Sequence, residues 1–148
     1  MATDNSSAKP IVVGVDASAS SVAALRKAAV LAASLNAPIE AVTVWHYPAT
    51  FDTTYAAEVW SPEKDAQDVL DASIAMAFPD GAPPALTAAI IPGPTASALI
   101  EKSKTAGMLV LGSRGRGGFA GLLLGSVSAA CAHHAHCPVL IMHGADST

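Results

Sequence analysis

The sequence predicts an α/β fold, an open five-stranded parallel sheet with helices on both faces. Short apolar runs rich in β-branched residues alternate with longer segments whose apolar residues recur at helical spacing. No two-residue hairpin signal such as Asn-Gly joins successive runs, so each connection is expected to be a right-handed crossover between parallel strands. The 32 alanines and only 5% aromatic residues favour helices packed closely on a flat sheet over an all-β sandwich.

Five apolar runs of strand length divide the chain. Each is short and nearly continuous, as expected for strands that are covered on both faces. In chain order they are 11–15 (IVVGV), 39–45 (IEAVTVW), 86–91, 108–111 (MLVL) and 138–142 (PVLIM).

Capping residues mark the four helices between these strands. Ser18 or Ser20 is a suitable N-cap for the first helix, and Asn36 is a suitable stop. The later helices begin at Ser61 with Pro62 in the first helical position, at Pro94, and after Gly125, and the last is expected to run to about His136. The segment 46–60 is a loop of about 15 residues, a length that is usually functional or mobile.

Length and composition limit the function classes. A chain of 148 residues has room for one domain, expected over 10–148 after a flexible polar leader at 1–9. No apolar run approaches the roughly 18 residues of a membrane span, and no secretory signal is recognisable, so a cytoplasmic protein without a membrane partner is expected. The net charge of −4 argues against a nucleic-acid partner.

Candidate ligand-binding residues follow two of the predicted strands. Asp16 comes directly after the first strand, and the glycine-rich segment 112–118 follows the fourth. Parallel sheets bind ligands beyond the carboxyl ends of their strands. Glycines allow close backbone approach to phosphate oxygens, and Gly125 with Ser126 opens a helix whose first N–H groups can bind an anion. A phosphate group is the ligand that this pattern favours.

Plainer interpretations stand beside this one. The glycine-rich segment can be a flexible connection, Arg114 and Arg116 can be solvated loop charges, and Asp16 can serve only as a helix cap. A Walker A loop and a dinucleotide fingerprint are both excluded, because no Gly-Lys-Ser/Thr opens the first helix and no glycine occurs in the turn after the first strand. Cys131 and Cys137, with the three histidines near them, offer too few ligands on one helical face for a structural metal site.

A resemblance to a known family adds to this interpretation. The spacing Gly112-x2-Gly115-x9-Gly125-Ser126 resembles the ATP-binding signature of the universal stress protein family. The start Val13-Gly14-Val15-Asp16-Ala17-Ser18 is similar to that family's first strand and acidic turn, and Val44-Trp45-His46-Tyr47-Pro48 and the last strand also match. The resemblance implies a Rossmann-like sheet with strand order 3-2-1-4-5.

The same resemblance implies a nucleotide site with ATP and Mg²⁺ at the ends of strands 1 and 4. Asp16 and the backbone near Val44 would contact the nucleoside, although Thr43 or Trp45 are alternatives to Val44. The glycine and serine signature would surround the phosphates. The implied nucleotide-binding residues are Gly14, Val15, Asp16, Val44, Gly112, Ser113, Arg114, Gly115, Gly125, Ser126, Val127 and Ser128.

The leading functional hypothesis is an ATP-binding stress-response module whose occupancy is read by partners, with slow or no hydrolysis. The alternative is an ATP-consuming hydrolase or adenylyl-transfer enzyme that uses the same site, and a structural dimer without a ligand is a third. The implied strand order makes 138–142 an apolar edge strand, so a homodimer through the last strand is expected. Of its two alternating sets, Leu140 with Met142 and Val139 with Ile141, one should face the protein's own helices.

Overall fold

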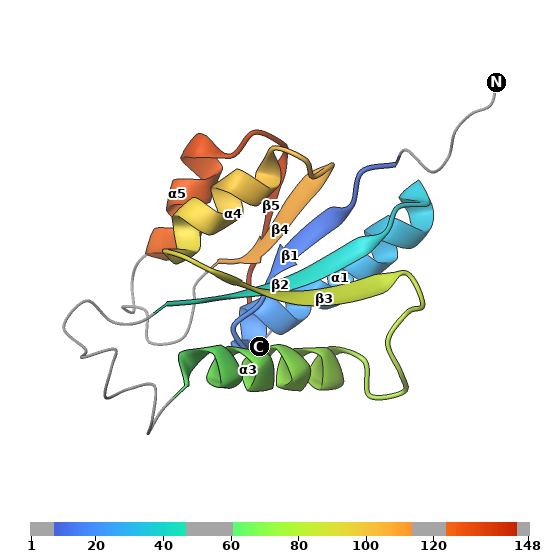
Figure 1. Ribbon diagram of the computed structural model, residues 1–148. Coiled ribbons are helices and arrows are strands. Elements are labelled where there is room, and N and C mark those ends of the chain that lie inside the picture. The colour runs from blue at the N-terminus through green and yellow to red at the C-terminus, as the bar shows by residue number, and fades with distance from the viewer. Residues whose placement is uncertain (1–7, 47–60, 114–123, 145–148) are drawn as a thin grey trace.

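Five parallel strands form the central sheet of the computed structural model, which describes residues 8–46, 61–113 and 124–144 (Figure 1). Their spatial order is β3-β2-β1-β4-β5, which confirms the predicted topology. The strands are β1 (Ile11–Gly14), β2 (Ile39–Trp45), β3 (Leu86–Pro92), β4 (Met108–Gly112) and β5 (Val139–Met142). The segments 1–7, 47–60 and 114–123, which hold most of the expected leader, the expected loop and part of the glycine-rich segment, lie outside the described residues.

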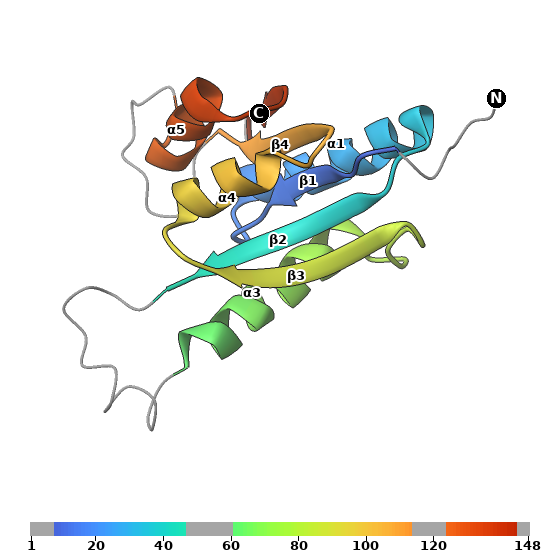
Figure 2. The ribbon, with the colours of Figure 1, turned by 45° about the horizontal axis from the view of Figure 1, so that its top comes forward.

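Helices cover both faces of the sheet, as predicted. α1 and α3 lie on one face, and α4 and α5 lie on the other (Figure 1, Figure 2). The helices are α1 (Ala19–Leu35), α3 (Pro62–Ala77), α4 (Thr95–Ser103) and α5 (Ser126–His134). Within the described ranges, none of these helices has the length and apolar character that a membrane crossing requires.

The helix ends follow from local sequence. Ser18 caps α1 by accepting a hydrogen bond from Ser21 N, and Asn36 ends it in the left-handed region with φ of 54°. Ser61 caps α3 in the same way. α5 ends at His134, two residues earlier than the expected end near His136, because the backbone is already extended at Ala135.

The alternation of side chains along the strands creates two cores. On β1, Ile11 and Val13 pack toward α1 and α3, whereas Val12 packs toward α4 and α5. All three are at most 1% exposed. A strand that is apolar on both faces is stable between two helical layers, which is where β1 lies.

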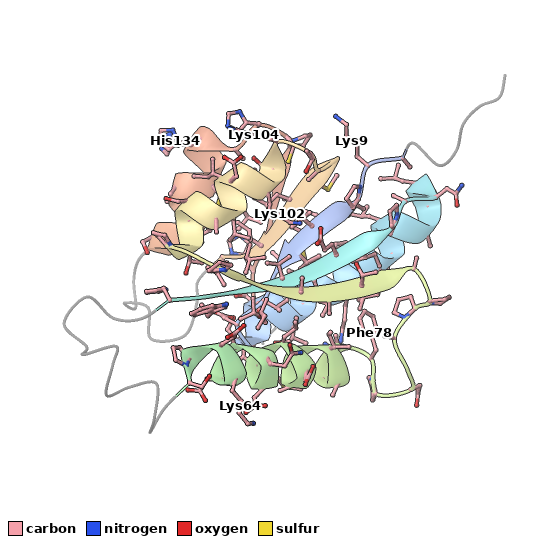
Figure 3. The ribbon with its side chains drawn as sticks, in the orientation of Figure 1. Lys9, Lys64, Phe78, Lys102, Lys104 and His134 are labelled. Atoms are coloured by element: carbon pink, nitrogen blue, oxygen red, sulfur yellow. The ribbon has the colours of Figure 1, made fainter. Side chains whose placement is uncertain are left out.

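Side chains also tie the layers together. Arg26 of α1 donates from Nε to Ala77 O (3.3 Å) and from Nη2 to Met76 O (2.9 Å), so it supplies the cation that the last turn of α3 lacks. Lys102 of α4 forms a half-buried ion pair with Glu40 of β2 (2.8 Å), while Lys64 points away from the sheet on the outer side of α3 (Figure 3).

The edge strand β5 differs from its expected packing. Leu140 and Met142 pack against the core beneath α1 and α3, and Val139 and Ile141 pack against the core beneath α4 and α5. All four residues are partly buried. Both alternating sets therefore contact the protein's own layers, because the sheet is sandwiched up to its last strand.

Candidate functional site

The carboxyl ends of β1, β2 and β4 meet at one edge of the sheet. Gly14 lies opposite Val42 of β2, and Val13 lies opposite Val110 of β4. Continuing this register places Asp16 beside Val44 and Ser113, each just past the level at which β1 and β4 end. We call this region, together with the start of α5 at Gly125–Val127, the carboxyl edge.

Asp16 lies in a turn that its own side chain helps to form. Ser18 N donates to Asp16 Oδ1 (3.0 Å), and Asp16 N donates to Ser21 Oγ (3.2 Å). Between them, Ala17 has φ of 69°, an uncommon conformation for a residue with a side chain. Asp16 is thus a turn residue in addition to a candidate ligand contact, and the N-cap of α1 is Ser18.

Close packing explains why glycine occurs at two of the predicted site positions, 14 and 112. A Cβ on Gly112 would lie against Ser20 Oγ and only 2.8 Å from Ser20 C and Ser21 N, all in the first turn of α1. A Cβ on Gly14 would point to the other face, 2.9 Å from Leu111 Cδ2 and 3.2 Å from Leu99 Cδ1. The lack of a side chain at Gly112 therefore allows α1 to pack closely on β4. The lack of one at Gly14 leaves room for side chains of β4 and α4.

Ser113 anchors the two ends of the glycine-rich segment. Its carbonyl oxygen accepts from Gly125 N (2.7 Å) and from Ser128 Oγ (2.9 Å), and its own N–H donates to Met142 O (2.7 Å). Ser113 is 6% exposed and Ser128 is 3% exposed. These bonds hold the start of α5 directly beyond β4. The Ser128 side chain is therefore buried and hydrogen-bonded within the protein.

The helices that follow β1 and β4 differ in the capping of their N-termini. The start of α1 is closed by the Ser18 side chain, with the Asp16 carboxylate beside it. α5 begins at Gly125 without a side-chain cap, and its first turn contains no acidic residue. The N–H groups of the first turn have no intrahelical acceptor, so the start of α5, at Ser126 and Val127, is the better place for an anion.

The backbone of β2 presents Val44 to the same edge. Val42 O accepts from Val15 N (2.9 Å), and alternation in a parallel ladder turns the N–H and C=O of Val44 toward β1 as well. Trp45 O faces β3, where it accepts from Gly93 N, and Thr43 uses its hydroxyl within the protein. The geometry favours Val44 over both alternatives as a backbone contact.

The remaining candidates have different positions. Arg114, Gly115 and Arg116 lie outside the described residues. Cys131 is a fully buried residue of α5, and burial, with a smaller contribution from Cys137, raises the pKa of its thiol to about 11. In the part of the chain that the structure describes, no three metal-ligating side chains gather.

A separate hollow of about 170 Å³ lies at the opposite end of the sheet. It is lined by residues of the last turns of α1 and of the segment before β3, among them Ala32, Asn36 and Pro84. Its lining is mainly apolar and carries no charged side chain. It therefore offers none of the chemistry gathered at the carboxyl edge.

Sequence reasoning missed the hydroxyls that organise this edge. Ser21 holds the main chain of Asp16, and Thr43 donates to Val15 O (2.9 Å). The sequence signal for Ser21 is the run of serines at 18, 20 and 21, which by itself indicates only an N-cap. The signal for Thr43 was a polar residue on the apolar face of a strand.

Comparisons with known proteins agree with this architecture. The model of the universal stress protein family matches residues 7–143. A universal stress protein of Mycolicibacterium smegmatis is 37% identical over 92% of this chain and 48% of its own length. A crystal structure of a universal stress protein in complex with cAMP is 30% identical, covers 92% of this chain and 97% of its own, and has a TM-score of 0.59. The structure of hypothetical protein MJ0577 is 16% identical over 94% of this chain and 98% of its own, with a TM-score of 0.72.

The relative from Mycolicibacterium smegmatis is longer than this chain, which spans about half of its length. The solved structures named above are instead matched over nearly their whole chains. The similarity in fold therefore extends over one complete α/β unit.

The close contact at Gly112 predicts a difference between two glycines. Gly112→Ala should lower the free energy of unfolding by about 1–3 kcal/mol, because the new Cβ meets backbone atoms of α1 that cannot move aside. Gly14→Ala should cost less, because the ends of two leucine side chains can shift. Urea denaturation of both variants measures this, and equal losses would contradict the packing role of Gly112.

Proposed function

This chain belongs to the universal stress protein family, and from that premise we propose that it binds ATP at the carboxyl edge of its sheet. The observation that carries the proposal is the start of α5, which has no side-chain cap and no acidic residue in its first turn and is hydrogen-bonded through Gly125 N to Ser113 O, directly beyond β4. In this proposal the protein acts in the cytoplasm as a regulatory module, and occupancy of the site is the signal that partners read.

The chemistry of the edge suits the parts of a nucleotide. The N–H groups at Ser126 and Val127 would hold phosphate oxygens. The Asp16 carboxylate would accept from ribose hydroxyls or from water on Mg²⁺, and the backbone of Val44 would meet the base. The relative that is 30% identical and was crystallised with cAMP supports an adenine nucleotide as the ligand.

The role of glycine is divided in this proposal. Gly112 and Gly14 serve packing, whereas Gly125 opens the anion-binding helix while its own N–H is used by Ser113 O. Arg114 and Gly115 would contribute from the segment between Ser113 and Gly125. The signature thus builds the frame of the site as well as its contact surface.

Three measurements on the purified protein test the proposed function. Chromatography and mass spectrometry of a denatured extract should detect co-purified adenine nucleotide, and calorimetry with Mg²⁺ should show binding of ATP. Incubation with labelled ATP should give at most a few turnovers in an hour, because rapid phosphoryl transfer requires positioned groups beyond those that bind. Many turnovers would favour the enzyme hypothesis, and neither bound nucleotide nor affinity would contradict the proposal.

Replacement of Asp16 by asparagine separates its two roles. Asp16→Asn keeps an Oδ1 acceptor for Ser18 N and removes the negative charge. We expect ATP affinity to fall by about tenfold, the loss of one charged hydrogen bond, with little change in melting temperature. Asp80→Asn, an exposed acid before β3, is the matched control in calorimetry. Equal affinity of the two variants would remove Asp16 from the site.

We also propose that two copies of the chain pair through β5, the edge strand beyond β4. Leu109 N donates to Pro138 O and Ser113 N donates to Met142 O, so the even-numbered residues of β5 bond to β4. By alternation, the N–H and C=O groups of Val139 and Ile141 face the free edge. These are the groups that a second β5 would satisfy.

Because hydrogen-bonding groups alternate between the two sides of β5, proline at two adjacent positions should have different effects. Ile141→Pro removes a donor from the free edge and should convert a dimer to a folded monomer. Leu140→Pro removes a donor to β4 and should destabilise the fold itself. Light scattering and circular dichroism distinguish these results. A wild-type protein that is monomeric at micromolar concentration would contradict pairing through β5.

A further inference from the structure

Thr43 of β2 has a buried hydroxyl close to the main chain that leads into Asp16. Thr43 is 7% exposed and lies on the same face of β2 as Ile39 and Ala41, which are at most 1% exposed. A buried polar group requires a hydrogen-bond partner, and Thr43 Oγ1 donates to Val15 O at 2.9 Å. The hydroxyl therefore donates its hydrogen bond to the main chain just after the end of β1.

This bond continues the pairing of β1 with β2 past the end of the strand. The main-chain bond from Val15 N to Val42 O (2.9 Å) comes first, and the Thr43 side chain then takes the Val15 carbonyl. A side chain thus holds a carbonyl that belongs to the residue directly before Asp16.

The peptide unit between Val15 and Asp16 is held at both of its polar atoms. Its oxygen accepts from Thr43 Oγ1 of β2, and its N–H donates to Ser21 Oγ of α1 (3.2 Å). This plane fixes the positions of the N and Cα atoms of Asp16, from which its side chain leaves. Two hydroxyls from separate elements therefore hold the main chain of Asp16, and Ser18 N holds its carboxylate through Oδ1 (3.0 Å).

We propose that Thr43 is a positioning residue of the nucleotide site, which acts by holding the Val15–Asp16 peptide so that the Asp16 carboxylate is preorganised for the ligand. This proposal rests on the proposed nucleotide binding at the same edge. Preorganisation lowers the cost of ordering a contact, so loss of the Thr43 hydroxyl should appear as weaker binding by a folded protein.

Three variants isolate the hydroxyl. Thr43→Val has nearly the same shape without the hydroxyl, whereas Thr43→Ser and Thr43→Ala both lack the methyl group and differ from each other only in the hydroxyl. Thr87→Val is the matched control, because Thr87 Oγ1 also donates across a strand pair, to Ile39 O at 3.4 Å, but at the opposite end of the sheet. Calorimetry with ATP and thermal melting are measured for each protein.

We expect Thr43→Val to bind ATP about three- to tenfold more weakly than the wild type, as for the loss of one hydrogen bond. Thr43→Ser should bind like the wild type, and Thr87→Val should leave affinity unchanged. In the Asp16→Asn background, Thr43→Val should cause little further loss, since Thr43 acts through Asp16. If Thr43→Val does not fold, the comparison of Thr43→Ser with Thr43→Ala decides.

Wild-type affinity in a folded Thr43→Val protein, or equal affinities of the serine and alanine variants, would overturn the positioning role. Additive losses in the double variant with Asp16→Asn would overturn it as well. These results leave the proposed function intact as long as the wild type binds ATP and Asp16→Asn weakens binding. A wild type without nucleotide affinity overturns the proposed function, and the role of Thr43 with it.

Discussion

The pairing of β1 between β2 and β4 fixes the position of every group at the carboxyl edge. Because all strands are parallel, the segments that follow β1, β2 and β4 leave the sheet together. Val12 and Val13, which point to opposite faces, are both buried, so β1 is covered by both helical layers. Extending the register of β1 with β2 and with β4 brings Asp16 level with Val44 and Ser113, which are distant from it in sequence.

Packing and binding use different glycines and different helices at this edge. α1 approaches β4 so closely at Gly112 that its first turn lies where a side chain would be, and its N-terminus is capped by Ser18. α5 is held through its Gly125 N–H and Ser128 hydroxyl, both on Ser113 O, and the N–H groups of Ser126 and Val127 remain at its uncapped start. The first N–H groups of α1 are thus capped within the protein, whereas the start of α5 is suited to bind an anion.

Periodicity and capping residues were sufficient to predict the strands, the helices and the layered fold, because each β-branched run is long enough to cross the sheet and each helix carries a local start signal. The strand order came from the resemblance, since parallel crossovers of similar length do not distinguish one order from another. The expected end of α5 near His136 was wrong because the chain becomes extended before Pro138.

The candidate site was predictable to a smaller extent. Asp16 and the start of α5 follow from the rule for parallel sheets, but the packing role of Gly112 depends on how near α1 lies, which no local pattern encodes. The bond from Thr43 to Val15 likewise joins two strands whose register is a property of the folded sheet. Long-range contacts of this kind determine which polar residues form hydrogen bonds within the protein.

Amide chemical shifts during a titration with ATP and Mg²⁺ test directly whether the nucleotide binds at the carboxyl edge. Nuclear magnetic resonance of the nitrogen-15-labelled protein reports each described backbone N–H separately, so it locates the ligand without a mutation. Binding at the carboxyl edge predicts that the largest saturable changes occur at Asp16, Val44, Ser126 and Val127. Changes centred instead on Ala37 and Ala85, beside the hollow at the opposite end of the sheet, or no changes at all, would contradict it.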